Sequence, residues 1–131
     1  MKFKHAIVVS ALAMGLTPAM AQTEIQWWHS MSGQLGEWIN GLAKGFNDSQ
    51  KDYKVVPVFK GTYPESFAAA IAAFRAGNAP HVLQVFEVGT ASMMASKGAI
   101  VPVNEVMSRA GVKFDANVYV PAVSGYYTAP N

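Results

Sequence analysis

The stretch HVLQVFEVGTASMMASKGAI, residues 81–100, decides the fold. Five of its first eight residues are Val, Leu or Phe. A near-continuous apolar run of this length is typical of a strand that is buried on both faces of a parallel sheet, so we predict a strand over Val82–Val88. A helix is expected to follow over residues 90–97, starting at Thr90. Glu87 then lies at the end of a buried strand, immediately before a helix begins.

The chain before this stretch shows the same alternation of strand and helix. Residues 24–29 are rich in β-favouring side chains and predict a first strand. A helix is predicted over Gly33–Ser49, because apolar residues recur there at helical spacing. We expect that apolar stripe to face the core; its members are Leu35, Trp38, Ile39, Leu42 and Phe46.

A second strand is predicted over Tyr53–Phe59, and Pro57 within it has no N–H to donate. This favours an edge position or a bulge. Pro64 is suited to open the next helix, and Gly77 with Asn78 is suited to close it. The predicted buried face of that helix consists of Phe67, Ala70, Ile71 and Phe74.

After residue 100 the pattern weakens. We expect a short strand or extended segment over residues 100–103, then a helix capped by Asn104 and ending at Gly111. The whole alternation predicts an α/β fold: a parallel or mixed open sheet with flanking helices and right-handed crossovers.

Polar and aromatic residues follow each predicted strand. In open α/β sheets, ligands bind in the crevice beyond the carboxyl ends of the strands. Tyr63 and Glu87 are the leading candidates for ligand contact at this edge. Further candidate crevice-lining residues are Trp28, His29, Ser30 and Thr90.

The first 21 residues have the organisation of a secretory signal peptide. Lys2 and Lys4 form a positive segment, an apolar segment follows, and Ala19-Met20-Ala21 is a cleavage site. We predict export to the periplasm and a mature chain of residues 22–131. Without the two lysines, the ten basic and eight acidic residues of the chain become eight of each. The absence of cysteine means that an exported chain is held by its core rather than by disulfides.

No pattern of a catalytic or metal site occurs in the sequence. There is no thiol nucleophile, no phosphate-binding loop, no nucleophile elbow and no His/Asp/Glu cluster with metal spacing. No cofactor is therefore expected, and no run of basic residues supports nucleic-acid binding. Glu87 has two interpretations: an acid facing water, or an acceptor for ligand hydroxyls. Tyr63 could pack on Pro64 or line a polyol site.

Three segments carry a resemblance to a known family: WHSMSGQLG (28–36), FKGTYPESFAAAIAAFRAGNAPHVLQVFEVGTASMMASKGAI (59–100) and PAVSGYY (121–127). The chain is similar to the N-terminal part of the glycerol-3-phosphate-binding members of the extracellular solute-binding protein family, which serve ABC importers. The resemblance implies a monomeric periplasmic subunit that captures sn-glycerol 3-phosphate, with glycerophosphodiesters as further candidates, and delivers it to membrane permease subunits. It implies that Tyr63 and Glu87 contact the ligand.

Members of that family are much longer and have a second α/β lobe. On this resemblance, residues 22–131 form an incomplete N-terminal lobe, and the isolated chain is expected to bind ligand weakly or not at all, because hinge closure needs both lobes. Three alternatives stay open. They are an oligosaccharide-binding protein of the maltose type, an exported enzyme of phosphodiester or sugar metabolism, and a truncated reading frame with no independent role.

Overall fold

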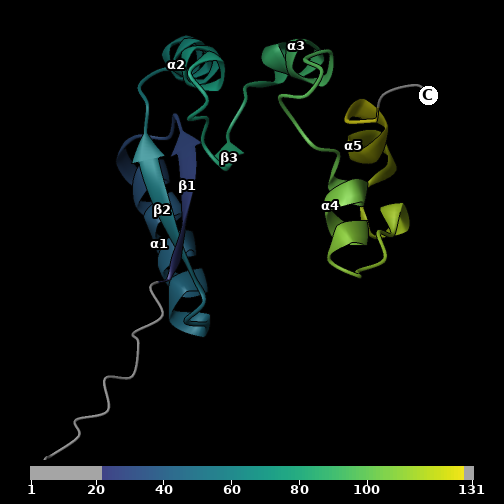
Figure 1. The fold of residues 1–131 in the computed structure, drawn as a ribbon, viewed down its shortest axis with the longest axis horizontal. Helices are drawn as coiled ribbons and strands as arrows, with labels where there is room; N and C mark the ends of the chain where they lie inside the picture. Colours follow the sequence, from purple (N-terminus) through teal and green to yellow (C-terminus); the bar gives the residue numbers. More distant parts are fainter. Residues whose placement is uncertain (1–21, 129–131) are drawn as a thin grey trace, which may run out of the picture.

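The structure is a computed structural model that describes residues 22–128. The predicted signal peptide lies outside the described residues. A parallel sheet of three strands, in the order β2-β1-β3, forms the centre of the fold. The strands are β1 (Thr23–His29), β2 (Tyr53–Phe59) and β3 (Val82–Leu83). Helices flank the sheet (Figure 1), which confirms the predicted α/β class with an open parallel sheet.

The helices are α1 (Gly33–Ser49), α2 (Tyr63–Arg75), α3 (Thr90–Met94), α4 (Val103–Arg109) and α5 (Pro121–Tyr126), with short 3₁₀ helices η1 (Glu87–Gly89) and η2 (Ala116–Val118). The chain passes from β1 to β2 in one direction and from β2 to β3 in the other. Right-handed crossovers then place α1 and α2 on opposite faces of the sheet. Beyond β3 the chain leaves the sheet, and α3 to α5 extend to its right in Figure 1.

The predicted bounds of α1 and β2 are confirmed residue for residue. β2 is also an edge strand, as Pro57 indicated, and Pro57 pairs in register with Trp27 of β1. The predicted closure of α2 is confirmed as well. Gly77 has a φ of +74°, a left-handed conformation that glycine adopts without a Cβ penalty.

The prediction of a seven-residue third strand is wrong. Only Val82 and Leu83 pair with β1, opposite Trp27 and Trp28. The physical reason is that β1 ends at His29, so the chain beyond residue 84 has no strand to pair with. The chain instead tightens into η1, where the Gly89 N–H donates to the Phe86 carbonyl at 2.8 Å. Glu87 therefore opens a 3₁₀ turn rather than ending a strand.

A small core lies between α2 and the sheet. Trp28 of β1 packs with Ala70 and Ala73 of α2, and the partly buried Val58, Ala69 and Leu83 surround them. On α1, only Ile39 and Ala43 are buried. The expectation that the α1 stripe faces the core is wrong for its larger members: Leu35, Trp38, Leu42 and Phe46 are all exposed, Trp38 at 61%. These side chains lie on a flank of the helix that nothing in residues 22–128 covers.

Two predictions after residue 94 are also wrong, namely the cap at Asn104 and the length of α3. Of the two alternatives for residues 100–103, the structure excludes the strand, because residues 100–102 have no neighbouring strand to pair with. Asn104 lies inside α4 instead of capping it, because the chain already turns at Pro102, whose carbonyl accepts from the Glu105 and Val106 N–H groups. α3 is shorter than predicted and ends at Met94.

Candidate functional site

The candidate site lies where the three parallel strands end. β1, β2 and β3 end at His29, Phe59 and Leu83, and parallel strands bring these ends to one edge of the sheet. The Lys60 N–H donates to the His29 carbonyl at 2.9 Å, and the Gln84 N–H donates to the Trp28 carbonyl at 2.9 Å. The loops that follow the strands are therefore tied to the sheet at their first residue.

Tyr63 and the segment that carries Glu87 meet at this edge. The ring of Tyr63, the first residue of α2, stacks on the ring of Phe86 with 4.8 Å between centroids and 25° between planes. Glu87 follows Phe86 directly. A small cavity of about 120 Å³ lies beside this stack, and its walls are Tyr63, Pro64, Phe67, Gln84, Val85, Phe86, Val88 and Gly89. Phe86, the residue before Glu87, thus contacts Tyr63, whereas Glu87 itself is not among the residues that line this cavity.

The backbone of Glu87 is fixed, whereas its carboxylate has no partner among the described residues. Its carbonyl accepts from the Thr90 N–H and from the Tyr126 hydroxyl, the latter at 3.1 Å. No hydrogen bond or ion pair within residues 22–128 uses its carboxylate oxygens. An ionised carboxylate accepts hydrogen bonds only, so this group is suited to the hydroxyls of a polyol.

A tight turn presents Tyr63. Glu65 reaches back and accepts hydrogen bonds from the Thr62 N–H at 2.7 Å and from the Thr62 hydroxyl at 2.8 Å. These two bonds lower the pKa of the Glu65 carboxyl. Gly61 has a φ of +82°, and a Cβ there would collide with the Glu65 carboxylate. The turn therefore depends on a residue without a side chain at position 61.

Trp28 is a core residue rather than an open wall of the crevice. Only 8% of it is exposed, and its Nε1 donates to Gln26 Oε1 at 3.1 Å. The Lys60 ammonium lies 3.8 Å from the centre of its ring, a cation–π contact. Sequence reasoning missed Lys60, although a single base directly after β2 was the available signal. It also missed Phe86, which was interpreted as a residue in the middle of a strand.

His29 and Ser30 are held tightly at the end of β1. His29 is 4% exposed, and its Nδ1 accepts from the Met31 N–H at 3.3 Å. Burial lowers the pKa of His29, because a charged imidazole loses hydration there. The Ser30 N–H donates to Gln84 Oε1 at 3.0 Å. The hydroxyl oxygens of Ser30 and Ser66 are buried and have no hydrogen-bond partner within residues 22–128.

The described part of the chain was also searched for metal sites and for membrane-spanning helices. Residues 22–128 contain no group of three or more His, Cys, Asp and Glu side chains that could hold a metal ion. Among the helices from α1 to α5, none has the length and apolar character needed to cross a bilayer. The contacts of Tyr63, Glu87, Trp28, His29, Ser30 and Thr90 with a ligand stay predictions.

Comparison with known proteins gives one consistent result. The chain is 56% identical over 131 residues to the sn-glycerol-3-phosphate-binding periplasmic protein of Yersinia enterocolitica, a match that covers 96% of this chain and 30% of that protein. It is 61% identical over 110 residues to the protein of the same name from Yersinia pestis, with 84% and 25% covered. The protein of that name from Brucella suis is 50% identical over 134 residues, with 98% and 31% covered.

No family model matches the chain. The chain spans about a quarter to a third of the length of the curated relatives that it matches. The resemblance deduced from the three sequence segments is confirmed: over nearly its whole length, this chain is similar to part of the sn-glycerol-3-phosphate-binding periplasmic proteins.

Proposed function

We propose that the chain is part of a periplasmic solute-binding protein of an ABC importer, and that residues 22–131 contribute to its N-terminal lobe. The ligand is sn-glycerol 3-phosphate, with glycerophosphodiesters as further candidates, and the partners are the membrane permease subunits. The protein is a monomer that has no catalytic activity and does not bind nucleic acid. The observation that carries the proposal is the 56% identity over 131 residues to a relative of that name.

The geometry at the sheet edge supports a ligand site. Tyr63 offers an aromatic face and a phenolic hydroxyl, and Phe86 holds its ring by stacking. Glu87 offers a carboxylate that has no partner among residues 22–128, on a backbone fixed by two hydrogen bonds. We assign Glu87 to the glycerol hydroxyls, because a carboxylate repels phosphate and accepts from hydroxyl groups. Tyr63 has a donor that suits either end of the ligand.

The lobe described by residues 22–128 provides one wall of such a site. A solute-binding protein closes two lobes around its ligand, and the binding free energy comes from both. We therefore expect the 131-residue chain alone to show no saturable stabilisation when titrated with sn-glycerol 3-phosphate in a thermal-shift experiment. Stabilisation that saturates at micromolar ligand would contradict this expectation.

The assignment of Tyr63 and Glu87 is tested in a full-length background. In a chimera, the segment that matches this chain in the Yersinia enterocolitica relative is replaced by this chain. Calorimetric titration with sn-glycerol 3-phosphate then compares Glu87→Gln and Tyr63→Phe with the unmutated chimera. Loss of a charge-assisted hydrogen bond predicts a Kd about 10- to 100-fold higher for Glu87→Gln.

Glu105→Gln and Tyr119→Phe serve as matched controls. Both side chains are exposed, and they lie in α4 and directly after η2, not in the loops that follow the strands. Their Kd is expected to stay unchanged. Equal Kd values for Glu87→Gln and Glu105→Gln would remove Glu87 from the site. Displacement of the ligand by maltose would favour an oligosaccharide-binding protein instead, and turnover of a phosphodiester by the chimera would favour an enzyme.

A further inference from the structure

The Tyr126 hydroxyl connects the end of α5 to the turn that carries Glu87. It donates to the Glu87 carbonyl at 3.1 Å, across 39 residues of sequence. Every other side-chain hydrogen bond that the structure describes for residues 101–128 joins groups two to four residues apart. This hydrogen bond therefore joins α5 to the candidate site.

The Tyr126 ring is held by its own surroundings. Tyr126 is the last residue of α5, and the Tyr127 N–H closes the helix there by donating to the Val123 carbonyl at 3.3 Å. The Tyr126 ring lies edge-on to the ring of Tyr127, with 4.9 Å between centroids and 79° between planes. The hydroxyl thus reaches Glu87 from a hydrogen-bonded helix end.

The turn that carries Glu87 has few bonds of its own. The Gly89 N–H donates to the Phe86 carbonyl at 2.8 Å, and the Thr90 N–H donates to the Glu87 carbonyl. A 3₁₀ turn such as η1 has poorer hydrogen-bond geometry than an α-helix. Before the turn, Phe86 is fixed by its stack on Tyr63. At Glu87 itself, the bond that comes from outside the turn is the one from α5.

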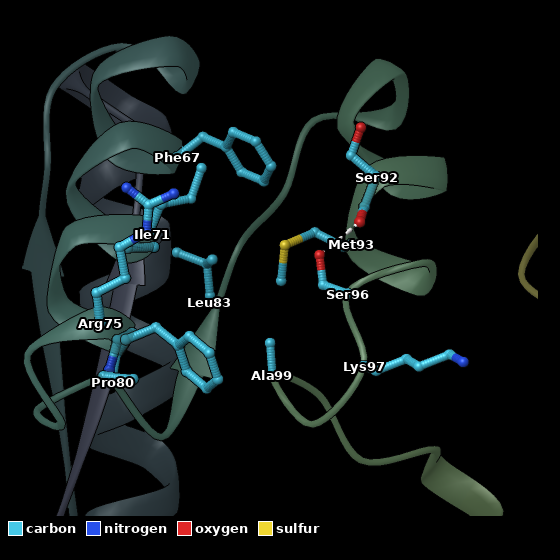
Figure 2. Close-up of a pocket in the computed structure, with 13 residues that line it drawn as sticks. Phe67, Ile71, Arg75, Pro80, Leu83, Ser92, Met93, Ser96, Lys97 and Ala99 are labelled. Carbon is cyan, nitrogen blue, oxygen red and sulfur yellow. Dashed lines mark hydrogen bonds between the residues drawn. The ribbon is translucent and has the colours of Figure 1, made fainter.

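α3, which follows this turn, does not press it against the sheet. A cavity of about 390 Å³ separates α3 from α2 and β3 (Figure 2). Phe67 lines it from α2, and Met93 lines it from α3. Because the turn lacks support from this side, the position of Glu87 depends on the Phe86 stack and on the Tyr126 hydrogen bond.

We propose that Tyr126 is a positioning residue for Glu87: its hydroxyl holds the Glu87 carbonyl and thereby directs the carboxylate toward the ligand hydroxyls. The proposal rests on the proposed function, since it needs Glu87 to contact the ligand, and it assigns no ligand contact to Tyr126 itself. Two observations support it, the hydrogen bond from α5 and the cavity behind the turn. An acceptor that is already held in place loses less conformational freedom on binding, so the bond raises the affinity for the ligand.

A double-mutant cycle in the chimera described above tests this role. Tyr126→Phe removes the hydroxyl and keeps the ring, and we expect calorimetric titration with sn-glycerol 3-phosphate to give a Kd about 3- to 10-fold higher. Glu87→Ala removes the group that is positioned, so adding Tyr126→Phe to that variant is expected to change Kd by less than about 2-fold. An equal rise in Kd in both backgrounds would overturn the proposal, as would an unchanged Kd for Tyr126→Phe alone.

Tyr127→Phe is the matched control for both experiments. Its ring adjoins that of Tyr126, and its hydroxyl makes no hydrogen bond within residues 22–128. Its Kd is therefore expected to equal that of the unmutated chimera. A rise in Kd as large as that of Tyr126→Phe would assign the effect to a general change in α5 and would overturn the proposal.

Amide hydrogen exchange in this chain tests the positioning step without ligand. The Thr90 N–H donates to the same carbonyl that Tyr126 contacts. Loss of the phenol loosens η1, so we expect the Thr90 amide to exchange about 3- to 10-fold faster in Tyr126→Phe than in Tyr127→Phe. The Gln84 amide, which is bonded to β1, is the internal reference.

The two experiments separate this proposal from the proposed function. Failure of the unmutated chimera to bind sn-glycerol 3-phosphate would count against the proposed function. Equal Thr90 exchange rates in Tyr126→Phe and Tyr127→Phe would overturn the positioning role, whether or not the chimera binds ligand.

Discussion

Residues 22–83 and residues 84–128 are stabilised in different ways. Every buried side chain of the described chain lies between Trp28 and Ala73, and none lies after it. The second region consists of short helices of five to seven residues, α3 to α5, each closed by local hydrogen bonds. Helices of that length are marginal in water without tertiary packing. The comparison shows that turn chemistry places helices along a chain, while a buried face is needed to hold them.

The largest expected effect comes from deleting the central side chain of the first region. Trp28→Ala removes a ring that is 8% exposed and packs on α2, so we expect a loss of about 3–5 kcal/mol in the free energy of unfolding. Trp38→Ala is the matched control: its ring is 61% exposed, and a change within about 0.5 kcal/mol is expected. Urea unfolding followed by circular dichroism measures both. Similar losses for the two variants would show that the α1 flank is covered after all.

Limited proteolysis addresses the contrast between the regions directly. Cleavage by trypsin needs local opening, and opening costs least where no side chain is buried. We expect the first cuts in native conditions at Lys97, Arg109 and Lys113, with Lys44 and Lys51 cut later. Mass spectrometry of the early fragments identifies the order. A first cut within α1 would reverse the assignment of the more stable region.

A smaller effect of opposite sign is expected at Ser66. Its hydroxyl is fully buried in α2 and has no hydrogen-bond partner in the described part of the chain, which costs about 1–3 kcal/mol relative to a satisfied group. Ser66→Ala removes the hydroxyl, and we expect the free energy of unfolding to rise by about 1 kcal/mol. Ser124→Ala, at an exposed hydroxyl of α5 that bonds to the Pro121 carbonyl, is the control. A fall in stability for Ser66→Ala would show that the hydroxyl bonds to an internal water.

The smallest expected effect is the pH dependence contributed by His29. Burial lowers its pKa in the folded state, so the unfolded chain binds the proton more readily. The contribution to stability is therefore fully present above the unfolded value of 6.5 and declines as pH falls below it. Urea unfolding between pH 7.5 and 5.5 measures the slope, and His29→Asn is expected to flatten it. That window lies above the range in which Asp48 and Glu65 titrate, since both have lowered pKa values. An unchanged slope in His29→Asn would assign the dependence to another group.

Much of the first region could be predicted from sequence because its signals are local. Apolar spacing gave the bounds of α1, and Pro57 gave the edge position of β2. Two other predictions failed because they depend on contacts with other segments, which the spacing of apolar residues does not specify. The length of β3 depends on where β1 ends, and the burial of Trp38 depends on whether another part of the chain covers it. Periodicity shows which residues are apolar, but it does not show what they contact.

In the candidate site, too, the features set by local signals could be predicted, and those set by contacts between distant segments could not. The rule that parallel strands end at one edge predicted that Tyr63 and Glu87 would lie near each other, and Tyr63 does stack on the residue next to Glu87. The stacking partner itself, Phe86, was not predicted, because the chain was expected to continue as a strand there. The burial of Trp28 and His29 depends on how α2 and the loops settle on the sheet, which no single segment specifies.

The Glu65 carboxylate lies close to the α-carbon of Gly61, and this has a consequence for the aromatic ring two residues later. A methyl group at position 61 would drive the Glu65 carboxylate off Thr62 and loosen the first turn of α2, where Tyr63 sits. Replacement of one α-hydrogen of Gly61 by a methyl group would thus disturb the stack of Tyr63 on Phe86 without contacting either ring. The orientation of Tyr63 therefore depends on the absence of a side chain at position 61. Gly61→Ala would misalign the Tyr63 ring although residue 61 does not contact it.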